Sequence, residues 1–358
     1  MEWKNDITRI LNIEYPIVQA PMFGVATTAM VVASSKANIL GSLPLGDLSP
    51  EKCIEVIRET KKLIDTPFAV NIFVNTIPFV SHELKERYNT TKEYIENLAK
   101  QHHLDVSLPE IEELKLTSYH EQIEAIITEK CKILSFTFGN LDQQSIDKLK
   151  SHGTVLIGTC TSVEEAKILE RSGIDIICVQ GIEAGGHRGS FTNDNTSQIG
   201  GLSLLSQVYD SVTVPLIYAG GIYNAKTLLA VKVLGAQGFQ IGSLFLGSKE
   251  SALNEAEKTR LRNTSEKDIV LTKSFSGKFA RGVKNVFIEA LENTDYILPY
   301  PYQYKLTSEL KNVAKSYNNT DFVSIWAGQS LHSFDGKSTA EIISNLIEQT
   351  EYSEKAYL

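Results

Sequence analysis

Short apolar runs with high β-propensity recur eight times along this chain, and helical patterns fill the intervals between them. The runs lack an alternation of polar and apolar residues, which is typical of parallel strands covered on both faces. Eight strand-then-helix units predict a TIM barrel. A doubly wound open sheet is the alternative, but such a sheet seldom needs eight evenly recurring strands. The predicted strands are Pro16–Ala20, Ile39–Leu43, Phe68–Val74, Ile133–Phe138, Val155–Thr159, Ile174–Gln180, Pro215–Ala219 and Gly238–Leu244.

Helix-capping residues lie between these runs. Ser49 followed by Pro50 is typical of an N-cap and a first helical position. The segment Thr161–Glu164 has the spacing of a capping box. Asn224 is expected to cap a helix over Ala225–Leu234, which Gly235 then ends.

Two stretches exceed what a plain barrel needs. The interval between the third and fourth runs is much longer than one crossover helix, and a long tail follows the eighth run. Both leave the C-terminal ends of strands, where TIM barrels carry their active sites. We therefore expect a smaller, mainly helical domain over the barrel mouth, although the charges of the insertion also suit a solvated helix face. The barrel is assigned to 1–75 and 117–250, and the substrate-covering domain with the C-terminal extension to 76–116 and 251–358.

Charge and composition exclude several classes of protein. The 358 residues carry a net charge of −8, which repels phosphate backbones, and no basic stripe offsets it, so no nucleic-acid partner is expected. No uncharged stretch is apolar enough for a membrane span. The four cysteines lack zinc-ligand spacing, which favours buried thiols in the cytoplasm and no metal site.

A glycine-rich loop with one histidine follows the sixth run, over Gln180–Gly189. Its glycines, Gly185 among them, permit a close approach of the backbone to a flat ligand, and His187 is placed between them. The polar segment 190–197 is expected to act as a lid. The plainer interpretation is a glycine-rich turn whose histidine is merely hydrogen-bonded.

Two further glycine clusters follow the seventh and eighth runs. Gly220 and Gly221 stand after the seventh, and Gln240–Ser243 end the eighth. In TIM barrels these two loops are the usual phosphate site, because exposed amides and a helix N-terminus favour an anion. Tight packing alone is the other interpretation. A single phosphate site suggests FMN or a sugar phosphate, and no G-x-G-x-x-G pattern supports a dinucleotide. FMN is favoured.

Several of these segments match a known family. They are Tyr15–Met22, the Asn71 of Val-Asn-Ile-Phe-Val, the Gln180–Gly189 loop, the Ala-Gly-Gly-Ile turn at Gly220, and the late motifs Phe275–Gly282 and Trp326–Gln329. The chain resembles nitronate monooxygenase, formerly 2-nitropropane dioxygenase, from about Ile7 to Gln329. The resemblance implies an FMN-containing TIM barrel that uses O2 to oxidise alkyl nitronates, such as propionate 3-nitronate, to a carbonyl compound and nitrite.

The resemblance also implies roles for single residues. His187 matches the catalytic histidine, either as a base or as a hydrogen-bond donor. Met22 is expected to lie against the flavin through its backbone, Asn71 and Gln180 to bond the ring system, and Gly185 to pack near it. The phosphate and ribityl side of the cofactor site is expected at Gly220, Gly221, Gln240, Ile241, Gly242 and Ser243.

Some positions depart from the family pattern. Asn224–Lys226 stand where the family usually has Asp-Gly-Arg, and Asn38–Gly41 where the end of strand two commonly reads Gly-Gly-Leu-Gly. We expect these changes to affect substrate preference more than FMN binding. For Lys278 and Arg281 the residues suggest only surface or interdomain ion pairs.

Two other functions remain open at this stage. An FMN-dependent enoyl-acyl-carrier-protein reductase of the same superfamily has a similar Gly-Gly-His loop, but the net charge of −8 weighs against an acidic carrier protein. A flavin-binding protein without turnover is the third possibility. The expected partners are a small-molecule nitronate and O2, in a monomer or homodimer.

Overall fold

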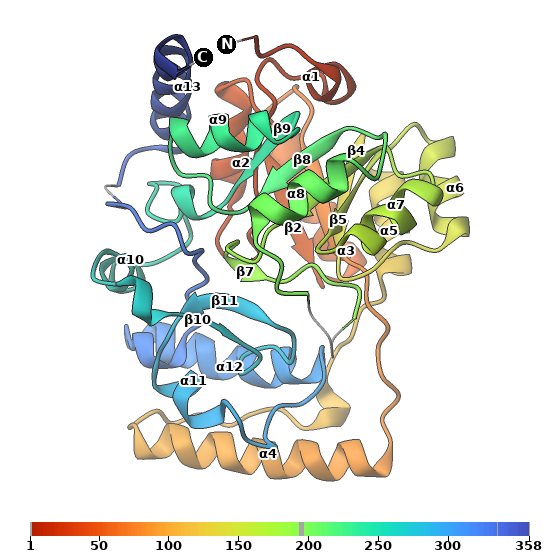
Figure 1. Cartoon of the computed structure of the whole chain (residues 1–358). Coiled ribbons are helices and arrows are strands. Elements are labelled where there is room, and N and C mark those ends of the chain that lie inside the picture. The colour runs from red at the N-terminus through yellow and green to blue at the C-terminus, as the bar shows by residue number, and fades with distance from the viewer. Residues whose placement is uncertain (1, 193–196, 335, 358) are drawn as a thin grey trace.

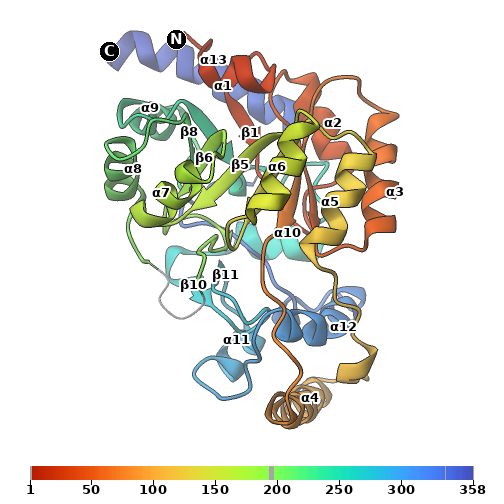
Figure 2. The ribbon, with the colours of Figure 1, turned by 90° about the vertical axis from the view of Figure 1, so that its right-hand side faces the viewer.

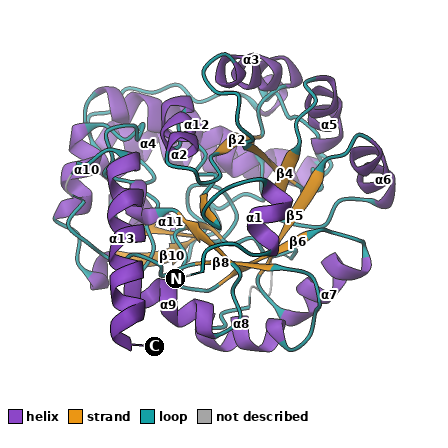
Figure 3. Ribbon diagram, turned by 90° about the horizontal axis from the view of Figure 1, so that it is seen from above, coloured by secondary structure: helices purple, strands orange, loops and turns teal. Residues whose placement is uncertain are grey.

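Eight parallel strands form a barrel in the computed structural model, which describes residues 2–192, 197–334 and 336–357. The neighbouring strands follow the order β1-β9-β8-β6-β5-β4-β3-β2, and every pairing is parallel (Figures 1 and 3). The predicted TIM barrel is confirmed. The strands are β1 (Ile17–Gln19), β2 (Ser42–Gly46), β3 (Ala69–Phe73), β4 (Ile133–Thr137), β5 (Val155–Cys160), β6 (Ile176–Gln180), β8 (Leu216–Ala219) and β9 (Gly238–Ile241).

The seam between β1 and β2 is closed by a side chain. The two segments share one bridge, Val18 with Leu40. Beyond it, the buried Gln19 amide takes over the backbone pairing, because its Oε1 accepts from Ser42 N at 3.1 Å and its Nε2 donates to Ser42 O at 3.3 Å. An amide that pairs like a peptide group satisfies the backbone N–H and C=O of Ser42 at the seam.

The second strand lies three residues later than predicted. Ile39 and Leu40 are fully buried, but they approach β1 before β2 begins at Ser42. Pro44 within β2 donates no hydrogen bond, which fits a strand that pairs continuously on one side only. The apolar run Ile39–Leu43 therefore predicts correctly which residues are buried, but it places the strand too early in the chain.

Helices cover the outside of the barrel, and two predicted caps are confirmed. Ser49 accepts from Lys52 N, and Asn224 accepts from Thr227 N at 3.0 Å. The third is displaced by one residue, because Ser162 caps its helix by accepting from Glu165 N. The helices are α2 (Thr28–Lys36), α3 (Pro50–Lys61), α5 (Tyr119–Thr128), α6 (Gln143–Ser151), α7 (Val163–Arg171), α8 (Gly201–Tyr209) and α9 (Ala225–Val233); α1 (Asp6–Leu11) lies at the end opposite the cap.

The insertion and most of the tail pack together into a cap with its own hydrophobic core (Figures 1 and 2). It was expected to be mainly helical, but it also holds a three-stranded sheet, β10-β11-β7, in which β7 (Gly186–His187) comes from the barrel loop. Its other elements are α4 (His82–Gln101), η1 (Ile111–Glu113), η2 (Ser243–Phe245) at its junction with the barrel, α10 (Glu255–Arg262), η3 (Glu266–Asp268), β10 (Ile269–Thr272), β11 (Ala280–Val283), α11 (Val286–Leu291), α12 (Tyr302–Ser316) and η4 (Thr320–Phe322).

The last helix, α13 (Thr339–Tyr357), returns to the barrel. It packs against α2 and α9, and its Ile343, Leu346 and Ile347 belong to the barrel core. Although 251–358 was assigned to the covering domain and extension, α13 supplies the helix that follows β9. Among the described helices none combines the length and apolarity of a membrane span.

The place of α13 predicts a stability effect. Ile343 is 0% exposed, so Ile343→Ala should lower the free energy of unfolding by about 2–5 kcal/mol. Tyr352→Ala on the same helix, 79% exposed, should change it by less than about 0.5 kcal/mol. Denaturant unfolding measures both, and equal effects would contradict this packing.

Candidate functional site

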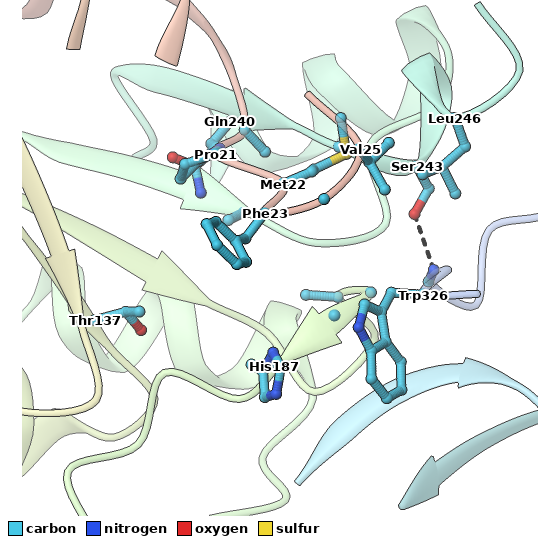
Figure 4. Close-up of a pocket in the computed structure, with 18 of the residues that line it drawn as sticks. Pro21, Met22, Phe23, Val25, Thr137, His187, Gln240, Ser243, Leu246 and Trp326 are labelled. Carbon is cyan, nitrogen blue, oxygen red and sulfur yellow. Dashed lines mark hydrogen bonds between the residues drawn. The ribbon is translucent and has the colours of Figure 1, made fainter. Parts of the chain in front are cut away.

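A cavity of about 330 Å³ opens at the C-terminal ends of the strands, between the barrel and the cap (Figure 4). Its lining comes from the loops after most of the barrel strands, from α12 and from the tail segment 323–330. This volume is within the range of small-molecule sites, about 300–1,000 Å³.

The cavity gathers nearly all residues predicted for the site. His187 lies across the space from Met22 in Figure 4. Ile241 is not in the lining: its side chain is buried in the barrel core and its carbonyl accepts from Ala20 N at 2.8 Å. The predicted residues that line the cavity are Met22, Asn71, Gln180, Gly185, His187, Gly220, Gly221, Gln240, Gly242 and Ser243.

His187 is held by the cap as well as by the barrel loop. In β7 it pairs with Ala280 of β11, and its Nε2 lies 2.8 Å from Ser276 Oγ. The Ser276 hydroxyl donates to Lys278 O at 3.0 Å, so its oxygen accepts the Nε2 proton of His187. Nδ1 therefore carries the lone pair, and no residue that the structure describes hydrogen-bonds to it.

The surroundings of His187 favour its neutral form. Burial, followed by the charges of Lys278 and Lys311, lowers the pKa of His187 to about 3. The Trp326 and Phe138 rings each lie 5.5 Å from its imidazole. At neutral pH the site thus holds an uncharged imidazole with a free acceptor nitrogen.

The Gln180 side chain is fixed by its own loop. Its Oε1 accepts from Gly189 N at 2.9 Å and from Arg188 Nη1 at 3.1 Å, and its Nε2 donates to His187 O at 3.0 Å. The buried Arg188 also donates to Gly181 O at 2.6 Å. An amide has two N–H donors, so one remains for a ligand in the cavity. Asn71 similarly donates to Ser135 Oγ at 2.9 Å.

Backbone amides form an anion cradle at the other end of the cavity. Within the described residues, the N–H groups of Gly220, Gly221 and Gly242 donate to no protein acceptor. Gly221 has a φ of +68°, which turns its amide in a way that a side chain would oppose. Ser330 Oγ donates to Gly221 O at 3.0 Å, and Ser243 Oγ accepts from Gly328 N at 2.9 Å (Figure 4). Unpartnered amides facing a cavity fit a phosphate group.

The tail segment Trp326–Ser330 was not assigned a role from the sequence. It crosses the glycine-rich loop so closely that a Cβ on Gly185 would lie 2.5 Å from Gly328 N. Gln329 N also donates to Glu183 O at 3.0 Å. This contact brings the late Trp-Ala-Gly-Gln motif to the side of the cavity that holds the amide cradle. Such a long-range contact leaves no local pattern in the sequence. Gly185 and Gly328 are the one signal that indicates a close backbone contact.

Sequence reasoning also missed an aromatic wall, which we define as Phe23, Phe73, Phe138, Tyr300 and Tyr304. Phe23, Phe73 and Tyr304 line the cavity, and the other two rings pack behind Phe73. The Phe73 and Phe138 rings are 4.8 Å apart, and Phe138 lies 5.6 Å from Tyr300. Phe138 has a φ of +79°, a conformation that a bulky residue rarely adopts and that concentrates at functional sites. This backbone strain directs a large ring toward His187 from the end of β4.

Lys278 and Arg281 do not lie on the surface as expected. Both are buried. Arg281 Nε donates to Ile182 O at 3.0 Å and so connects β11 to the glycine-rich loop. The Lys278 ammonium lies 4.6 Å from the centre of the Phe138 ring.

Two other expectations concern single segments. Asn38–Gly41 precede β2 and are not part of the cavity lining, so they do not alter the pocket as supposed. Residues 193–196 of the proposed lid lie outside the described residues. Asn224 caps α9 as expected at the departure from the family turn.

Taken together, the unpartnered amides, the free amide proton of Gln180 and the cavity volume fit FMN. The contact at Gly185 gives a direct test. Gly185→Ala places a methyl against backbone, a strain of about 1–3 kcal/mol, and should weaken FMN binding at least about tenfold. Gly200→Ala, whose added Cβ would meet nothing within 4 Å, should bind FMN like wild type. Fluorescence titration with FMN measures both, and unchanged affinity in Gly185→Ala would exclude this placement of the cofactor.

Comparison with known proteins identifies the family of the chain. Residues 4–349 match the sequence model of the nitronate monooxygenase family. A probable nitronate monooxygenase of Staphylococcus haemolyticus is 35% identical over 98% of both chains. The nitroalkane oxidase from Streptomyces ansochromogenes superposes with a TM-score of 0.89 at 27% identity, over 99% of this chain and 100% of that one. FabK from Thermotoga maritima shares the fold: it superposes with a TM-score of 0.75 at 24% identity, over 99% of this chain and 98% of that one. The chain belongs to the nitronate monooxygenase family.

Proposed function

We propose that this protein is an FMN-dependent monooxygenase that oxidises small alkyl nitronates with O2 to a carbonyl compound and nitrite. The observation that carries the proposal is the neutral His187, whose acceptor nitrogen has no protein partner in the described residues and lies in the same cavity as the amide cradle. Membership of the family supports the reaction class.

The residues that would hold FMN divide by chemistry. The amides of Gly220, Gly221 and Gly242 suit the phosphate, and the side-chain amides of Asn71 and Gln180 suit the polar edge of the ring. When bound, FMN supplies the redox chemistry between the organic substrate and O2. The protein's own contribution is to bind, orient and exclude water.

In this function His187 accepts a proton from the substrate and does not stabilise a negative charge on it. With Nε2–H given to Ser276, its Nδ1 is an acceptor, so it suits the removal of the α-proton from a neutral nitroalkane. A nitronate that arrives already ionised needs no base. The aromatic wall and Trp326 then confine the substrate beside the imidazole.

The cysteines indicate where the enzyme works. We propose a cytoplasmic enzyme, because Cys53, Cys131, Cys160 and Cys178 are free and buried. The expected partners are the nitronate and O2.

Replacement of the histidine separates binding from catalysis. His187→Ala should retain FMN, and its turnover of neutral nitroethane should fall at least about 100-fold, since a general base contributes about 10²–10⁴. Its turnover of preformed ethyl nitronate, which needs no base, should fall much less. Oxygen uptake measures the rates and absorbance the bound flavin. His152→Ala, at the exposed end of α6, serves as the control. A fully active His187→Ala would remove the catalytic assignment.

The lowered pKa of His187 predicts an unusual pH profile. An ordinary imidazole loses its acceptor function as the pH falls through about 6.5. Because the pKa of His187 is lowered to about 3, it stays neutral and kcat/KM for nitroethane should stay level from about pH 7 to about pH 5. A decline with a midpoint near 6.5 would show an unperturbed histidine.

The reductase alternative is tested in the same preparation. Oxygen uptake with propionate 3-nitronate and no oxidation of NADH by a crotonyl thioester is the result that we expect. NADH oxidation without oxygen uptake would favour an enoyl reductase, and silence in both would favour a flavin-binding protein.

A further inference from the structure

Helix α12 presents a tyrosine and a lysine to the cavity. Tyr304 and Lys311 both line it, and a spacing of seven residues places them on one face of the helix. The Lys311 ammonium lies 4.4 Å from the centre of the Tyr304 ring, within the range of a cation–π contact. The tyrosine ring therefore restricts where the ammonium lies.

The other cations of this helix near the cavity have carboxylate partners. Lys305 Nζ lies 2.5 Å from Asp47 Oδ2, and Lys315 Nζ lies 3.0 Å from Glu257 Oε2. In the part of the chain that the structure describes, no carboxylate lies within ion-pair distance of Lys311. Glu257 is the one acidic residue in the described lining, and Lys315 already neutralises it.

An apolar surface connects Lys311 to the histidine. The Phe23 ring lies 6.4 Å from Tyr304 and 6.0 Å from Phe73, and Phe73 lies 6.4 Å from His187. A ligand between them would meet an aromatic wall, a cation at one end and a neutral imidazole at the other. A small organic anion has this distribution of charge.

We propose that Lys311 is the anion-binding residue of the substrate pocket, with Tyr304 holding its ammonium in place. The ligand chemistry is a planar oxyanion with two or three oxygens on one centre, as in carboxylate, nitrate, nitrite or nitronate. Charge-assisted hydrogen bonds from the ammonium to such oxygens are stronger than neutral ones. This inference names the substrate-binding residue of the proposed function. It rests on that function only for the identity of the natural ligand.

The environment of Lys311 makes this binding sensitive to pH. Burial lowers the pKa of Lys311 to about 8. The negative charge of Asp47 raises this pKa, and the positive charge of Lys305 lowers it further. Tyr304, the neutral His187, the buried Cys178 and the Glu257–Lys315 pair are the other titratable groups of the described lining. Because the charged lysine binds the anion, affinity should fall as the pH rises through about 8.

Nitrate is the probe for this subsite, since it needs no turnover. It is titrated into the FMN-loaded protein by calorimetry, with the flavin absorbance as a second readout. Wild type should bind nitrate, and Lys311→Met should bind it at least about tenfold more weakly, as expected for loss of a charged hydrogen bond. Lys311→Arg should restore part of the affinity, and Lys148→Met, a surface lysine of α6 paired with Glu124, should not change it.

The proposal is overturned if Lys311→Met binds nitrate like wild type, or if wild type binds neither nitrate, nitrite nor acetate. Should Lys311→Met fail to fold, Lys311→Gln takes its place. Bound flavin and the melting temperature establish that a variant is folded.

Two substrates distinguish the sources of the anion. A KM that rises in Lys311→Met for both ethyl nitronate and propionate 3-nitronate identifies the nitronate group as the ligand, and a rise for the second alone identifies its carboxylate. Unchanged KM for both contradicts the proposal. A wild type without nitronate turnover would contradict the proposed function alone, because the nitrate titration still tests Lys311.

Discussion

The short antiparallel pairing of Gly186–His187 with Ala280–Arg281 is the contact on which the rest of the site depends. It joins a loop of the barrel to a strand of the cap, so the histidine belongs to both. Ser276, in the turn that joins β10 to β11, then fixes which nitrogen carries the proton. Without this ladder the imidazole would lose the pairing and the Ser276 hydrogen bond that orient it over the barrel mouth.

Burial and charge divide the tasks inside the cavity. His187 is kept neutral by burial and by nearby lysines. Lys311, whose pKa burial lowers to about 8, is still mainly charged at neutral pH, and Asp47, the carboxylate near it, is paired with Lys305. An oxyanion is thus attracted to the cavity without the base being protonated. In the proposed function the glycine amides take the FMN phosphate and Lys311 takes the substrate anion, so the two do not compete for the same charge.

The barrel and the glycine-lined side of the cavity could be predicted from the sequence because their signals are local. Apolar runs, caps such as Asn224 and the glycine clusters at strand ends all report on their immediate neighbours. The aromatic wall, Lys311 and the crossing of Gly328 over Gly185 join segments far apart in the chain and carry no such pattern. Even a local pattern can mislead. Ile39 and Leu40 have the apolar pattern of a strand because they are buried, but only one isolated bridge pairs them. Most site roles remain predictions.

The most direct test is a crystal structure of the protein grown with FMN. The account predicts electron density for a flavin between Met22 and His187, its phosphate on the amides of Gly220, Gly221 and Gly242. Density elsewhere, or a mouth closed by side chains with no flavin bound at saturating FMN, would contradict it.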